Sequence, residues 1–99
     1  MAKRKLIWSK NAKIQLFEIL EYFNERNESS KYSKKLYKRF VKEASVLMKY
    51  PELGVKSNLP SVRGLIAEEY ILFYEITVKY IIIHTIWDTR QNPVNLQIK

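Results

Sequence analysis

Two dense apolar runs near the C-terminus decide the fold: Tyr70-Ile-Leu-Phe-Tyr-Glu-Ile76 and Tyr80-Ile-Ile-Ile-His-Thr-Ile-Trp87. Both are rich in β-branched and aromatic residues and contain neither Gly nor Pro, which is typical of strands with a largely buried surface. Only residues 77–79 separate them, so we expect two antiparallel strands at the centre of one sheet. Neither face of these strands is cleanly polar. We therefore expect helices on one face and a functional surface or a partner on the other.

The alternation of side chains along a strand assigns each residue to a face. In the first strand Tyr70, Leu72, Tyr74 and Ile76 share a face. In the second strand the same rule separates two sets, which are Ile81, Ile83, Thr85 and Trp87 on one face and Tyr80, Ile82, His84 and Ile86 on the other. Strict alternation thus predicts that Trp87 and Ile86 lie on opposite faces, with Trp87 beside Ile83.

Two amphipathic helices are predicted upstream, over residues 10–26 after an N-cap at Ser9 and over residues 30–49 before Tyr50-Pro51. Each has apolar residues at helical spacing. In the first helix these are Ala12, Leu16, Ile19, Leu20 and Phe23, widened by Ile14 and Phe17; in the second they are Leu36, Phe40, Ala44 and Leu47, with Tyr37, Val41 and Met48 in a neighbouring row. The short connection between the helices predicts an antiparallel hairpin.

Two weaker strands complete the pattern, at residues 4–8 and 61–67. The order of elements predicts an α+β fold in a single domain spanning residues 1–99. It consists of an N-terminal strand, an antiparallel helical hairpin and a three-stranded antiparallel meander, all strands forming one sheet. The N-terminal strand must pair either at an edge or in the middle of that sheet, and the helical hairpin should cover one face.

The composition excludes several classes of site. There is no Cys, one His and only two Gly among 99 residues, which excludes a Cys nucleophile, a Cys/His zinc site and a Gly-rich phosphate loop. We predict no metal and no cofactor. Neither a signal peptide nor a membrane span is recognisable, so we expect a soluble, cytoplasmic protein.

The net charge of +8 is unevenly distributed. Residues 1–17 hold five basic and no acidic side chains, residues 18–30 hold four Glu and one Arg, and residues 31–49 hold seven basic side chains and one Glu. This concentration suits a polyanionic partner, either nucleic acid or an acidic protein segment. The alternative is a solvated helix face that serves solubility.

A few side chains are candidates for chemistry or recognition. His84 is a candidate general acid or base, with a structural His as the alternative. Arg63, Arg90 and Lys56 are candidates for holding phosphate, with surface ion pairing as the alternative. Tyr70, Tyr74 and Tyr80 are candidates for stacking on bases, with core packing as the alternative.

The chain resembles the RelE/ParE superfamily of type II toxin–antitoxin toxins, and within it the ParE-like branch. The resemblance covers nearly the whole chain and is carried by motifs in a fixed order. These are Ile7-Trp8-Ser9, Tyr32-Ser-Lys-Lys-Leu36, Tyr50-Pro-Glu-Leu-Gly54, Val62-Arg-Gly-Leu65, Tyr74-Glu-Ile76 and Ile86-Trp-Asp-Thr-Arg-Gln-Asn-Pro93. The fold that the resemblance implies agrees with the one predicted above.

The resemblance implies two alternative activities. RelE-like members cleave mRNA at the ribosome with basic residues on the sheet, and where they carry a key Arg this chain has Leu65, with Arg63 two residues earlier. The C-terminal His/Tyr pair of some ribonucleases is absent as well. If the chain is a ribonuclease, the catalytic candidates are Arg63, Arg90 and His84.

ParE-like members lack that catalytic set and inhibit growth by binding DNA gyrase, and the missing residues favour this branch. The candidates for binding the target or the antitoxin are Arg63, Tyr70, Tyr74, Trp87 and Arg90. The resemblance also implies a cognate antitoxin, a role in plasmid stabilisation and a possible toxin dimer within the toxin–antitoxin complex. A third hypothesis is a binding module that has lost toxicity.

Overall fold

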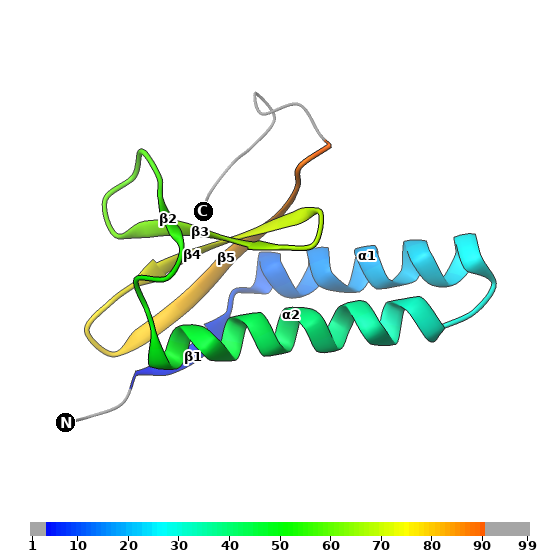
Figure 1. Cartoon of the computed structure of the whole chain (residues 1–99), viewed down its shortest axis with the longest axis horizontal. Helices are drawn as coiled ribbons and strands as arrows, with labels where there is room; N and C mark the ends of the chain where they lie inside the picture. The colour runs from blue at the N-terminus through cyan, green and yellow to red at the C-terminus, as the bar shows by residue number, and fades with distance from the viewer. Residues whose placement is uncertain (1–3, 91–99) are drawn as a thin grey trace.

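The computed structural model describes residues 4–90 and shows an α+β fold with one sheet (Figure 1). The elements are β1 (Lys5–Trp8), α1 (Lys10–Asn27), α2 (Lys31–Lys49), β2 (Val55–Lys56), β3 (Val62–Ala67), β4 (Tyr70–Ile76) and β5 (Tyr80–Asp88). The predicted order of strand, helical hairpin and antiparallel meander is confirmed. The bounds of the predicted elements differ from the observed ones by no more than a residue at each end.

The sheet has the strand order β1-β5-β4-β3-β2, so the hairpin of β4 and β5 lies in its middle. β1 lies at one edge and runs parallel to β5, with Lys5 paired to Tyr80 and Trp8 to Ile83. The other pairings are antiparallel. The two-residue strand β2 at the opposite edge was not predicted, because the stretch after Gly54 has no alternating pattern.

The helical hairpin covers one face of the sheet, and its loop end projects beyond the sheet (Figure 1). α2 supplies most of the helical core: Leu36, Phe40, Ala44 and Leu47 are at most 2% exposed, as their spacing predicted. The neighbouring row does not join the core, since Tyr37, Val41 and Met48 are 37–47% exposed. Within residues 4–90, neither helix carries an apolar stretch long enough to cross a membrane.

Polar contacts anchor the start of α1 to the sheet. The Ser9 hydroxyl caps the helix by accepting from the Ala12 amide at 3.0 Å, and it donates to the His84 carbonyl at 3.0 Å. One turn later the Gln15 side-chain oxygen accepts from the Ile86 amide at 2.7 Å and from the Thr85 hydroxyl at 3.0 Å. These bonds satisfy groups in β5 that would otherwise be buried without partners.

A β-bulge at His84 changes the faces of β5. Phe73 pairs with Thr85 but Tyr74 pairs with Ile83, so His84 is an extra residue on its strand. Beyond the bulge, Ile86 lies opposite Leu72 and is 5% exposed, while Trp87 lies opposite Ile71. The prediction from strict alternation is therefore wrong for Ile86 and Trp87: Ile86 faces the helices and Trp87 lies on the open face.

Candidate functional site

The open face of the sheet, which the helices do not cover, carries an ionisable pair in an apolar setting. His84 Nε2 lies 2.8 Å from Glu75 Oε1, and the two side chains are 17% and 36% exposed. Ile82 lies on the same face because it pairs directly with Glu75. Phe73 shares this face because it lies two residues before Glu75 on β4. A carboxylate beside an imidazole fixes its orientation and can share a proton with it. This is the arrangement in the described chain that most nearly fits acid–base chemistry.

Arg63 lies on the other face, the one covered by the helices. It pairs with the buried Tyr74, and its Nη1 donates to the carbonyls of Gly54 at 2.9 Å and Glu52 at 3.3 Å. Leu65 lies on this covered face too, opposite Leu72 and 6% exposed. The position where a ribonuclease of the superfamily carries a key Arg is therefore a core position in this chain.

Lys56 lies directly across the β2–β3 pair from Arg63, so the structure brings these two predicted cations together. They line an open pocket of about 510 Å³ with the loop of residues 57–61. Arg63 itself holds the turn after α2 against β3, because its two carbonyl partners, Glu52 and Gly54, belong to that turn.

Tyr70 and Tyr74 were candidates for binding, and the structure places both in the core. Tyr70 is 4% exposed and packs edge-on against Phe40, with ring centroids 5.5 Å apart. Tyr74 is 0% exposed; its hydroxyl donates to the Pro51 carbonyl at 2.7 Å and accepts from the Gly54 amide at 2.9 Å. Burial raises the pKa of both phenols, so both remain protonated at neutral pH. They support the site and do not form its surface, which agrees with the core-packing alternative.

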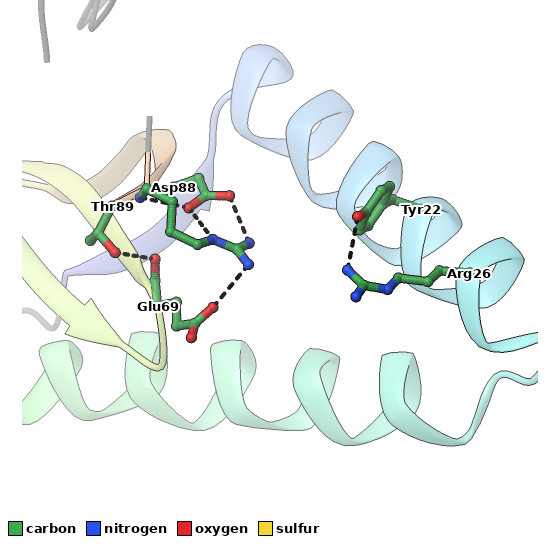
Figure 2. A network of polar contacts seen from close by, with 6 residues as sticks. Tyr22, Arg26, Glu69, Asp88 and Thr89 are labelled. Carbon is green, nitrogen blue, oxygen red and sulfur yellow. Dashed lines mark hydrogen bonds and ion pairs between the residues drawn. The ribbon is translucent and has the colours of Figure 1, made fainter. Parts of the chain in front are cut away.

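Arg90 lies just past β5 and forms ion pairs with Glu69 and Asp88, both of which are labelled in Figure 2. Its Nε and Nη2 donate to the two Asp88 oxygens at 2.9 and 2.8 Å, and its Nη1 lies 3.2 Å from Glu69. The hydrogen bonds from Arg90 lower the pKa of the Asp88 carboxyl. Thr89 closes the network by donating to the Glu69 carbonyl at 2.9 Å. The Arg90 guanidinium is thus paired with two carboxylates, which agrees with the alternative of surface ion pairing.

The structure does not bring the three catalytic candidates together. Arg63 lies opposite Tyr74, whereas Asp88, which holds Arg90, lies opposite Tyr70, four residues away along β4. At about 3.3 Å per residue this separates their backbones by roughly 13 Å. His84 lies on the opposite face from Arg63. Within residues 4–90 no group of three or more His, Asp or Glu side chains is placed to hold a metal ion.

A family model described as the ParE toxin of the type II toxin–antitoxin system, parDE, matches residues 6–93. The chain belongs to the ParE toxin family. A solved structure titled "Chromosomal ParDE TA system from P. aeruginosa" is similar in fold, with a TM-score of 0.76 at 21% sequence identity, and the match covers 87% of this chain and 96% of that one. A search of curated proteins found no significant match. The resemblance drawn from the motifs is confirmed at the level of family and fold.

The ParDE family implies an antitoxin partner, and the outer side of the hairpin offers surface for a protein. Seven large apolar or aromatic side chains on the two helices are between 37% and 65% exposed: Ile14, Phe17, Tyr22, Tyr32, Tyr37, Val41 and Met48. The helical spacing predicted that Ile14 and Phe17 widen the apolar stripe of the first helix, and that Tyr37, Val41 and Met48 form a row beside the main apolar row of the second. The sequence did contain a sign that some of these side chains are exposed. α2 has two apolar rows, and packing against one face of a sheet buries only one of them.

Proposed function

We propose that this ParE-family chain inhibits growth by binding DNA gyrase and performs no chemistry itself. The observation that supports this is the dispersal of the catalytic candidates. Arg63 is hydrogen-bonded to carbonyls beneath the sheet, Arg90 is paired with carboxylates at its end, and His84 lies alone with Glu75 on the other face. Phosphodiester cleavage needs cations and an acid or base around one phosphate.

The target-binding surface in this proposal is the open face of the sheet around Trp87 together with Arg90. Trp87 is half-buried beside Ile71, and Ile66 on the neighbouring strand is 62% exposed. Aromatic and Arg side chains dominate the energetics of protein interfaces, so Trp87 and Arg90 are the first residues to substitute. The Arg63 contribution is to hold the turn after α2 in place.

An experiment on supercoiling tests the proposal. The purified chain should inhibit gyrase supercoiling of relaxed plasmid and leave mRNA intact in the presence of ribosomes. Trp87→Ala and Arg90→Ala should each weaken inhibition about tenfold or more, because truncating an interface anchor costs on the order of 1.4 kcal/mol or more. Val78→Ala, at an 89% exposed position in the loop between β4 and β5, is the matched control. RNA fragments that appear only with ribosomes, without inhibition of gyrase, would refute the proposal.

The alternative is an mRNA endoribonuclease acting at the ribosome, and the His84–Glu75 pair at 2.8 Å is the observation in its favour. Under that alternative His84→Ala or Arg63→Ala abolishes cleavage while antitoxin binding survives. Unchanged cleavage in both variants removes these residues as the catalytic site. Induction of the chain without an antitoxin that leaves growth unchanged would favour the remaining hypothesis, a binding module without toxicity.

We propose further that an acidic antitoxin covers the apolar side chains of the hairpin. A basic chain with exposed apolar rows suits a partly disordered acidic segment that folds on contact. The product of a neighbouring small acidic open reading frame should co-purify with the chain. Phe17→Glu should weaken that complex strongly and leave the melting temperature of the free chain almost unchanged, since Phe17 is 65% exposed. Full retention of the complex would contradict this placement.

A further inference from the structure

One face of α2 carries a continuous row of lysines that the proposed function does not use. Lys31, Lys35, Lys38, Lys42 and Lys49 recur at intervals of three, four or seven residues, and Ser45 fills the remaining turn. At 3.6 residues per turn these positions fall within an arc of about 80°, roughly opposite the buried Phe40. All are exposed. With a rise of about 1.5 Å per residue, the row is roughly 27 Å long.

The charges of this row are not neutralised within the described chain. The single acidic residue of α2, Glu43, is paired with Arg39 at 3.0 Å, and Arg39 also holds Glu68 at 2.9 Å. Among residues 4–90 no ion pair involves a lysine of the row. A helix that places five cations in line, without a compensating carboxylate between them, repels itself by small amounts at each i, i+4 pair. A polyanion laid along the row would remove that repulsion.

The chemistry of the row narrows the choice of polyanion. A tight protein interface needs buried apolar anchors. On α2 these are Tyr37, Val41 and Met48, which lie to one side of the lysine row, so we assign the acidic antitoxin to that side and not to the row itself. Single-stranded nucleic acids are held by successive bases stacking on aromatic rings along the groove. Here the aromatic rings beside the row lie only near its two ends: Tyr32 lines a pocket with Lys35, Lys38 and Lys42, and Lys49 Nζ lies 5.9 Å from the centroid of the Tyr50 ring. The deep, narrow major groove of A-form RNA does not admit a helix, whereas that of B-form DNA does. Lysines are flexible point charges and suit contacts to phosphates that do not read bases.

We propose that the lysine row of α2 binds the phosphate backbone of duplex DNA without sequence preference. At about 3.4 Å per base pair, its length corresponds to roughly eight base pairs. This binding is independent of gyrase inhibition, because it uses neither the open face of the sheet nor Trp87. It would concentrate the protein on DNA, where any DNA-bound target is found.

Fluorescence anisotropy with a labelled duplex of about 25 base pairs, titrated with the full chain between about 50 and 200 mM salt, tests the proposal. Five phosphate contacts predict a slope of log affinity against log salt of about −4.5. The triple variant Lys35→Gln, Lys38→Gln, Lys42→Gln should bind at least about tenfold more weakly and reduce the slope by about 2.7. Duplexes of unrelated sequence should bind alike.

The matched control is Lys10→Gln, Lys13→Gln, Lys79→Gln, which removes the same charge from exposed positions on α1 and in the loop before β5. It should change affinity less than about twofold, because these side chains lie outside the row. Equal losses in both triple variants would overturn the proposal in favour of a general charge effect. Tighter binding of duplex RNA or of polyglutamate would also overturn it. Circular dichroism melting shows whether the variants are folded, so that a loss of binding is not mistaken for unfolding.

Discussion

The two helices of the hairpin are almost equal in length, yet they hold to the sheet in different ways. α2 buries five side chains and is attached by apolar packing. α1 buries only Ala12 completely, while Leu16, Ile19 and Phe23 pack half-buried against the core. Its start is attached to β5 by the hydrogen bond that Ser9 donates to the His84 carbonyl and by the one that Gln15 accepts from the Ile86 amide. The difference teaches that α2 is held by a buried apolar row and α1 by polar contacts at its start, while both helices leave apolar side chains exposed.

The same substitution on each helix gives the sharpest contrast. Phe40→Ala removes a ring that is 0% exposed and should lower the free energy of unfolding by about 3–5 kcal/mol. Phe17→Ala removes a ring that is 65% exposed and should change it by less than about 0.5 kcal/mol. Urea denaturation of both variants measures the difference. Similar losses in the two variants would show that α1 is held by its apolar face after all.

The connection that follows α2 offers a smaller test of how firmly that helix is attached. Tyr74→Phe removes the hydroxyl that bonds Pro51 and the buried Gly54 amide, and should cost about 1–3 kcal/mol because the amide loses its partner. The raised pKa of Tyr74 favours the folded state below the unfolded pKa of about 10, and that contribution is lost as pH rises through the higher folded pKa. The Phe variant should therefore be less sensitive to alkaline pH than the parent in the same denaturation assay.

On α1 the corresponding test removes a polar anchor. Gln15→Leu keeps the bulk of the side chain but leaves the Ile86 amide and the Thr85 hydroxyl without their acceptor, and should cost about 1–2 kcal/mol. Hydrogen exchange of the Ile86 amide should accelerate more than that of amides in β4. Unaltered protection at Ile86 would mean that water replaces the glutamine without loss.

The smallest expected difference lies at the helix starts. Ser9→Ala should cost about 1 kcal/mol, because its hydroxyl caps α1 and also reaches the His84 carbonyl. Ser30 precedes α2 and makes no side-chain cap bond, so Ser30→Ala should cost only a few tenths of a kcal/mol. Thermal melting of the two variants side by side measures this. A larger loss at Ser30 would reverse the assignment of the polar anchor to α1.

Local periodicity carried most of the fold prediction. The spacing of Leu36, Phe40, Ala44 and Leu47 identified the core face of α2, and the density of β-branched residues identified β4 and β5. Family membership followed from the order of short motifs. Each of these signals depends on a few neighbouring residues, so it can be recognised in the sequence alone.

The missed features depend on contacts between distant residues. The bulge at His84, which turns Trp87 to the open face, leaves no mark in the alternation of β5. The face of Arg63 depends on its pairing with Tyr74, and its carbonyl partners lie in a turn about ten residues upstream. The pairing of Arg90 with Glu69 and Asp88 was predicted only as the alternative to phosphate binding, because the sequence alone did not decide between the two. For these reasons the sequence could name candidate residues but could not predict how they are arranged.

The parallel pairing of β1 with β5 can form only late in the synthesis of the chain. Lys5 pairs with Tyr80, and Ser9 with His84 at a separation of 75 residues. At about 5–20 residues per second, roughly 4–15 s pass between the emergence of β1 and that of its partner strand. Until then β1 and β4 both lack the strand between them. The complete sheet therefore assembles only when translation of the described chain is almost finished. A chain stalled before Tyr80 contains β2, β3 and β4 but lacks β5, which carries Trp87 and joins β1 to the meander.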